Sequence, residues 1–137
     1  MANLMYNAFP EHLAKGDIDL DTHTLYGALL TSSYTPTATH EAYSDLTNEV
    51  ANGNGYATGG KALTSVTVAE SGGVTTLDAA DMQWAGSTYS CQYLAIYDYT
   101  AAGKYLICVL DLGAKSPNSS TFTVQFHTDG ILTFQAS

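Results

Sequence analysis

The stretch GNGYATGGKALTSVTV, residues 53–68, carries the spacing of a nucleotide-binding loop. Gly55, Gly60 and Lys61 lie at the G-x-x-x-x-G-K positions, where backbone amides would cradle phosphates. Ala62 then replaces the hydroxyl that should hold magnesium, and the β-branched run that follows predicts a strand where a phosphate site needs a helix N-terminus. We therefore expect positive-φ turns leading into a strand, supplied by Gly53, Gly55, Gly59 and Gly60.

A second motif, DIDLDTH at residues 17–23, opens like a calcium-binding loop. Such a loop needs Gly at its sixth position and a bidentate Glu at its twelfth, where this chain has Thr22 and Ala28. We expect instead an extended stretch in which Ile18 and Leu20 point inward. Its carboxylates should stay in water; they belong to Asp17, Asp19 and Asp21.

The histidines show no metal-binding spacing such as H-x-x-x-H. They are His12, His23, His40 and His127. The spacing still allows a metal bound by two residues, either His23 with Asp21 or His127 with Asp129, since each pair is two positions apart. The favoured interpretation is that all four are plain surface residues, with no metal and no cofactor bound.

Acid–base chemistry has one candidate pair, Asp78 and Asp81, just before Trp84 in LDAADMQW. Two carboxylates beside an aromatic ring could cleave a glycosidic bond, but aspartates between two strands are also common turn formers. No G-x-S-x-G occurs, and neither Cys91 nor Cys108 has a context that would activate a thiol. We expect no catalytic residue and no enzymatic activity.

Tyrosines form the last candidate site. With period-two alternation, Tyr89, Tyr93 and Tyr97 share one strand face, and Leu94 and Ile96 share the other. Such a ladder could be an exposed interface or a sugar platform, because tyrosine suits surfaces that are apolar at one end and wet at the other. The alternative is that it forms the rim of a sandwich core.

Charge excludes one class of partner. The chain has four Lys, no Arg and 13 acidic residues, a formal net charge of −9. Nucleic-acid binding depends on cationic side chains that displace phosphate counterions, so no nucleic-acid partner is expected. There is no apolar run of 18 residues and no signal-peptide pattern, so we expect no membrane partner and synthesis in a host cytoplasm.

The elements that must position these residues are mostly strands. β-branched and aromatic runs predict strands near 24–32, 61–70, 74–79, 88–98, 104–112, 120–127 and 131–135. Pro10 and Gly16 bound a short helix near 10–15, which a turn at 3–8 could precede. We expect one all-β domain over residues 1–137, an antiparallel β-sandwich of jelly-roll or immunoglobulin-like type. It has an N-terminal helical arm at 1–16 and a long loop excursion at 34–57, which could hold a short helical piece.

Two local pairings follow from the pattern. A three-residue loop at 128–130, with Gly130 left-handed, would make a hairpin that sets Phe126 opposite Leu132 and Val124 opposite Phe134. A hairpin around the turn at 100–103 would set Cys91 opposite Leu112, which places it too far from Cys108 for a disulfide. We expect two buried free thiols.

The order of several segments resembles a family of small structural proteins of tailed bacteriophages and prophages. The resemblance runs from Tyr6 to Phe134, and its most specific parts are ALLTSSYTP, the GY-x-x-GGK-x-L turn and the closing DGIL. The chain departs from the family at residues 90–93, SCQY, where relatives typically carry T-A-R-Y. In this family the glycines and Lys61 lie at a loop-to-strand entry without nucleotide chemistry.

The resemblance implies a virion component, expected to be a decoration or cement protein on the capsid surface. The expected partners are the major capsid protein and further copies of the chain, a trimer being favoured because capsid lattices offer three-fold positions. The alternative is a virion-attached binding module, such as a head fibre, tail or host-attachment protein. The apolar N-terminal arm should dock on its own sheet or on a neighbouring subunit; with the tyrosines above, it supplies the candidate interface residues Leu4, Met5, Tyr6, Phe9 and Leu13.

Overall fold

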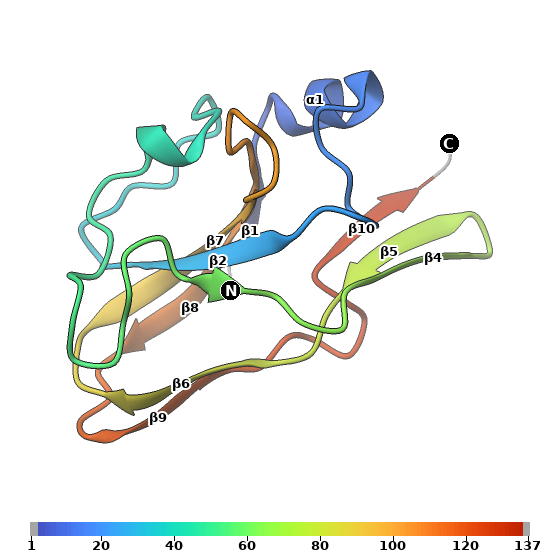
Figure 1. Cartoon of the computed structure of the whole chain (residues 1–137). Coiled ribbons are helices and arrows are strands. Elements are labelled where there is room, and N and C mark those ends of the chain that lie inside the picture. Colours follow the sequence, from blue (N-terminus) through green and yellow to red (C-terminus); the bar gives the residue numbers. More distant parts are fainter. Residues whose placement is uncertain (1–2, 136–137) are drawn as a thin grey trace.

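Antiparallel strands build the fold, in agreement with the predicted all-β sandwich class (Figure 1). The computed structural model describes residues 3–135. Its elements in chain order are β1 (Asn3–Met5), α1 (Phe9–Lys15), β2 (Leu25–Leu30), the 3-10 turn η1 (Tyr43–Asp45), β3 (Lys61–Ala62), β4 (Thr67–Ser71), β5 (Val74–Asp78), β6 (Met82–Ser87), β7 (Cys91–Asp98), β8 (Leu106–Lys115), β9 (Ser120–Val124) and β10 (Leu132–Gln135).

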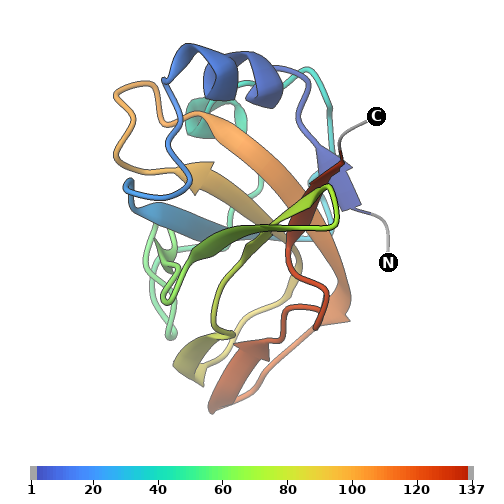
Figure 2. The ribbon, with the colours of Figure 1, turned by 90° about the vertical axis from the view of Figure 1, so that its right-hand side faces the viewer.

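The strands form three sheets. A five-stranded sheet has the order β1-β8-β7-β2-β3, a three-stranded sheet has the order β10-β5-β4, and β6 pairs with β9. Figure 2 shows α1 above the three-stranded sheet and the β6–β9 pair below it. The two smaller sheets together cover one face of the five-stranded sheet, so the layers are those of a sandwich.

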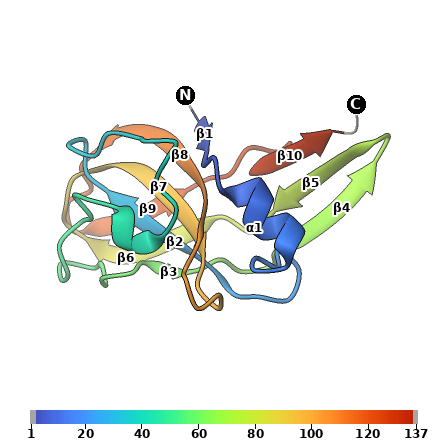
Figure 3. The ribbon, with the colours of Figure 1, turned by 90° about the horizontal axis from the view of Figure 1, so that it is seen from above.

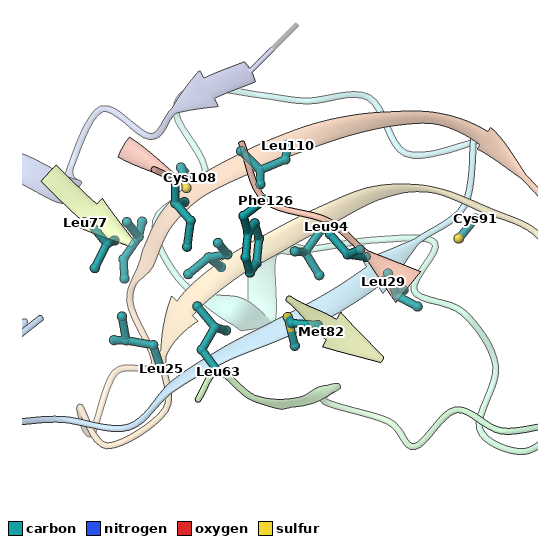
Figure 4. Close-up of a cluster of buried hydrophobic side chains, with 14 of the residues drawn as sticks. Leu25, Leu29, Leu63, Leu77, Met82, Cys91, Leu94, Cys108, Leu110 and Phe126 are labelled. Carbon is teal, nitrogen blue, oxygen red and sulfur yellow. The ribbon is translucent and has the colours of Figure 1, made fainter. Parts of the chain in front are cut away.

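Both faces of the five-stranded sheet are buried. In β7, Leu94 and Ile96 point into a first core cluster shared with the smaller sheets, and Ala95 and Tyr97 point into a second cluster on the opposite face. Figure 4 shows the first cluster, where Met82 of β6 lies near Leu94. Because both faces are covered, β7 is an almost continuous apolar run.

The excursion, residues 34–57, covers the second cluster. Tyr34, Tyr43 and Leu46 pack there, and the chain then turns around the end of β2, where the Val50 amide donates to the Leu29 carbonyl at 3.0 Å. Val50 itself is buried in the first cluster. The predicted short helical piece is confirmed as η1.

The N-terminal arm docks on its own sheet. Residues 3–5 form β1, which pairs with β8 through Met5 and Cys108, so the possible turn at 3–8 is limited to residues 7–8. The helix prediction is confirmed: Gly16 ends α1 with a left-handed φ of 83°. Phe9 is fully buried, and its ring centroid lies 5.7 Å from that of Phe134 in β10.

The predicted C-terminal hairpin is wrong. Val124 of β9 pairs with Met82 of β6, and Leu132 of β10 pairs with Leu77 of β5. Gly130 does have the expected positive φ, 99°, but its turn carries the chain from one small sheet to the other. The sequence pattern predicts the turn and which side chains of each strand point inward. Which strand each one pairs with depends on residues far away in the sequence.

Two bulges alter the β7–β8 hairpin. The register shifts between Cys91 and Tyr93 and again between Ile96 and Tyr97, so Cys91 faces Lys115 and not Leu112. Both cysteines are buried and free, as predicted.

Two strand predictions differ from the structure. No strand was predicted over β6, and the single strand predicted at 61–70 is divided into β3 and β4.

Candidate functional site

The glycine-rich loop closes against the edge of β2. The predicted positive φ values are confirmed: 112° at Gly53, 94° at Gly55, 95° at Gly59 and 83° at Gly60. A Cβ on Gly60 would lie 1.9 Å from the carbonyl oxygen of Gly27, so only glycine allows this close approach of two backbones. The loop has a packing role at the entrance of β3.

Lys61 is engaged on the neighbouring small sheet. Its Nζ donates to the carbonyl oxygen of Gln83 at 2.6 Å and lies 5.7 Å from the ring centroid of Trp84. Both partners belong to β6. The lysine that completes the phosphate-loop spacing therefore bridges β3 and β6.

Glu49 is the centre of a polar network that sequence reasoning missed. Its carboxylate accepts hydrogen bonds from the hydroxyls of Tyr43 and Tyr56 and from the Gly59 amide, the last at 2.7 Å. The Tyr97 hydroxyl donates to the Gly59 carbonyl at 2.6 Å. Burial, and then the contact with Glu49, raises the pKa of both Tyr43 and Tyr56. This network fastens the excursion to the sheet.

His12 is buried between two carboxylates, so its assignment as a plain surface residue is wrong. Its Nδ1 lies 2.9 Å from Oδ2 of Asp17, its Nε2 lies 2.7 Å from Oε1 of Glu41, and its ring stacks on Tyr105 with centroids 3.6 Å apart. Burial lowers the pKa of His12, but the hydrogen bonds to Asp17 and Glu41 outweigh it, and the pKa ends above its usual value. The arrangement ties α1 to the excursion.

The DIDLDTH segment is a turn and not the extended stretch that was predicted. Ile18 and Leu20 are buried, as expected. The Asp19 carboxylate accepts from the amides of Asp21, at 2.9 Å, and Thr22, at 3.0 Å. Hydrogen bonds from Thr22, followed by that from the Asp21 amide, lower the pKa of Asp19. The carboxylate oxygens of Asp19 thus stabilise the turn in which this residue lies.

The other histidines also have protein partners. His23 Nδ1 lies 2.6 Å from Oδ2 of Asp98, a fully buried carboxylate, and not beside Asp21. His127 lies 3.4 Å from Asp129, with both side chains largely exposed. Among residues 3–135, no three His, Cys, Asp or Glu side chains gather as a metal site would require.

Asp78 is the last residue of β5, and Asp81 lies in the short connection between β5 and β6, so the turn interpretation holds for the position of Asp81 alone. The Asp81 carboxylate accepts from the Phe126 amide at 2.9 Å, and that of Asp78 accepts from the Ala79 amide at 2.8 Å. Asp78 thus holds the backbone next to it, whereas Asp81 binds the backbone of a residue 45 positions later in the chain.

The tyrosine ladder is divided between the two faces of the sheet. Tyr93 and Tyr97 pack on the second cluster, while Tyr89 lies before β7 and packs on the first cluster, so its predicted placement beside them is wrong. Tyr97 is only 1% exposed. Of the arm residues, Tyr6 and Phe9 are buried, Leu4 and Leu13 half-buried, and Met5 is exposed.

A hollow of about 540 Å³ lies between α1 with its following turn and the three-stranded sheet. Figure 3 shows α1 next to β5 and β4. The hollow is mostly apolar and is hereafter called the α1–β4 groove; its lining consists of Leu13, Gly16, Ile18, Asp19, Leu20, Asp21, Val68, Thr75 and Phe134.

The chain matches no protein-family model, no curated protein and no solved structure. Over the described range 3–135, none of the helices has the length and hydrophobicity needed to cross a membrane.

Proposed function

We propose that the protein is a structural component of a tailed-bacteriophage virion that decorates or cements the head. The observation that carries the proposal is the resemblance of ALLTSSYTP, GY-x-x-GGK-x-L and DGIL to small phage structural proteins. In the fold these segments make backbone contacts: Gly60 closes on Gly27, and a Cβ on Gly130 would lie 3.0 Å from the Leu77 carbonyl oxygen. Glycines that fix the course of the backbone suit a protein that must present a rigid surface complementary to its neighbours.

The distribution of polar groups supports the same proposal. His12, Glu49 and Asp98 each hold a loop or the helix in place through protein partners. His12 joins α1 to the excursion, Glu49 joins the excursion to the loop before β3, and Asp98 of β7 holds the turn that follows it. A cement protein needs a rigid body, solubility at high copy number and a face that fits its neighbours. The formal net charge of −9 favours solubility and opposes non-specific association.

The proposed mechanism is burial of surface across adjacent capsomers, which would stabilise the shell against the pressure of packaged DNA. The partner is then the major capsid protein. Local three-fold positions of a capsid lattice would favour a trimer of this chain on the particle.

Gold-labelled antibody imaging tests the proposal on intact particles of the phage or prophage that encodes the chain. Label spread over the head, with hundreds of copies per particle in quantitative mass spectrometry, is the expected result. Absence of the protein from purified particles would overturn it.

Label confined to the tail, with a handful of copies, would instead favour the alternative, a head-fibre, tail or host-attachment module. The excursion or the surface around Tyr93 would then be the candidate contact for a glycan or receptor. Tyr93 is half-buried, whereas Tyr97 is covered, so the tyrosine face available for such a contact is small.

A further inference from the structure

We propose that the α1–β4 groove and the free edge of β4 together bind an extended segment of another virion protein, apolar at its centre and flanked by Lys or Arg. The inference rests on the proposed function only in taking a virion protein as the source of that segment. Three features of the described residues carry it: an open strand edge, an apolar hollow beside that edge, and acidic groups at its rim.

The first feature is the edge strand. β4 pairs with β5 alone and is the outer strand of its sheet, and all five of its residues are exposed. Natural edge strands are commonly protected by charged side chains, especially Lys, by Pro, by a bulge or by extreme shortness. The sequence of β4, TVAES, has one charged residue, Glu70, and neither Lys nor Pro, and its pairing with β5 is regular from Thr67 to Ser71. Its outer backbone groups can therefore pair with an added strand.

The second feature is the apolar face next to that edge. Val68 is 37% exposed and lines the groove together with Phe134, Leu13 and Ile18. Val68 pairs with Leu77, which in turn pairs with Leu132, so these residues share one sheet face. A strand added beside β4 would direct every second side chain to this face, where the groove offers apolar surface.

The third feature is charge, which selects the occupant. The charged residues that line the groove are Asp19 and Asp21, and Glu70 lies two positions from Val68 on the same face of β4. Cationic residues on either side of an apolar centre would complement them.

This chain cannot supply such a segment from a second copy. It has no Arg, and its four Lys are at positions 15, 61, 104 and 115, so no short stretch carries two of them. Lys15 pairs with Glu11, and Lys61 and Lys104 donate to backbone carbonyls of their own fold. The occupant is therefore a different protein.

A peptide titration tests the inference on the full chain. The probe is the acetylated and amidated heptapeptide KTVTVTK, whose two Val and two Lys share one face when it is extended. Binding is followed by amide chemical shifts of the isotope-labelled protein. We expect shifts concentrated on β4 and the groove, and an affinity about tenfold higher than for ETVTVTE, a difference that salt reduces.

Two variants of neighbouring residues provide the matched control. Val68→Lys places a cation in the groove and should weaken binding of KTVTVTK about tenfold. Thr67→Lys changes the opposite face of the same strand and should leave the affinity within about twofold. The inference is overturned if millimolar KTVTVTK leaves β4 unperturbed, if both variants bind equally, or if the free chain self-associates through β4.

The peptide titration uses the isolated protein and does not require phage particles, so the two proposals can fail separately. If KTVTVTK binds as expected but purified particles lack the protein, the proposed function fails together with the virion source of the segment, and the binding of a cation-flanked strand at the groove stands. If particles carry the protein and the Val68→Lys and Thr67→Lys variants are incorporated equally, the groove is not the virion contact and the inference fails alone.

Discussion

Nε2 of His12 lies 2.7 Å from Oε1 of Glu41, a residue 29 positions further along the chain. On the other side of the ring, Nδ1 faces Oδ2 of Asp17 at 2.9 Å. A neutral imidazole can donate from one nitrogen only, so two carboxylate partners together require the imidazolium. The contact that joins α1 to the excursion thus depends on a proton.

Replacing His12 by Gln should make stability less dependent on pH. Because the pKa of folded His12 lies above its usual value, its contribution is complete below about pH 6.5 and is lost as pH rises through the folded pKa. We expect His12→Gln to lower the free energy of unfolding by about 1–2 kcal/mol near pH 6 and by less near pH 9. Urea unfolding followed by Trp84 fluorescence measures both values.

His127→Gln is the matched control, because 73% of the His127 side chain is exposed. It should change stability by less than about 0.5 kcal/mol at either pH. A His12→Gln cost that stays constant from pH 6 to 9 would show that the ring acts by packing alone.

Glu49→Gln should loosen the excursion. The carboxylate accepts from three donors, and an amide group in its place turns one of the two acceptor oxygens into a donor. We expect a loss of about 2 kcal/mol in the free energy of unfolding, with faster hydrogen exchange at residues 43–59. Glu11→Gln, on the exposed side of α1, should be nearly neutral; equal costs for the two variants would refute a special role for Glu49.

Gly60→Ala should be severely destabilising, by more than about 3 kcal/mol, because its Cβ would overlap the Gly27 carbonyl. Gly72 has a similar left-handed φ, 60°, but no atom within 4 Å of its Cβ position. Gly72→Ala should therefore cost only about 1 kcal/mol, the conformational penalty alone. Thermal melts of the two variants separate crowding from backbone conformation, and similar midpoints would contradict the close approach.

The two thiols should be unreactive in the folded protein. Burial raises the pKa of Cys91 to about 11 and that of Cys108 to about 12, and the thiolate is the reactive form. We expect a disulfide-exchange reagent to label neither cysteine at neutral pH and both in urea. Rapid labelling of one thiol in native buffer would reveal local opening of β7 or β8.

Local chemistry made several elements predictable. Pro10 and Gly16 bracket α1, the apolar run over Leu25–Leu30 gives β2, and the positive φ of Gly60 follows from its place in the loop. Each depends on residues close in sequence, where propensity and steric limits decide the outcome.

The pairing partner of each strand, and the sheet face on which each side chain lies, were harder to predict from the sequence. Val124 and Leu132 have the alternation of a hairpin, yet each pairs with a residue that lies more than 40 positions earlier in the chain. The irregular pairing between Cys91 and Tyr93, where two steps along β7 face four steps along β8, breaks the simple alternation, and Tyr89 and Tyr93 pack on different clusters. Glu49 and His12 gain their roles only from contacts across the fold.

The pairing of Asn3 with Leu110 sets an order of events during synthesis. β1 leaves the ribosome early, but its partner on β8 does not exist until residues 108–110 have emerged. The buried position of Tyr6, whose amide donates to the Ile107 carbonyl at 3.2 Å, is likewise unavailable to a nascent chain that ends before that point. Such long-range closure is slow. The arm therefore joins its sheet after most of the chain has been translated, and a truncated product would leave it without a partner strand.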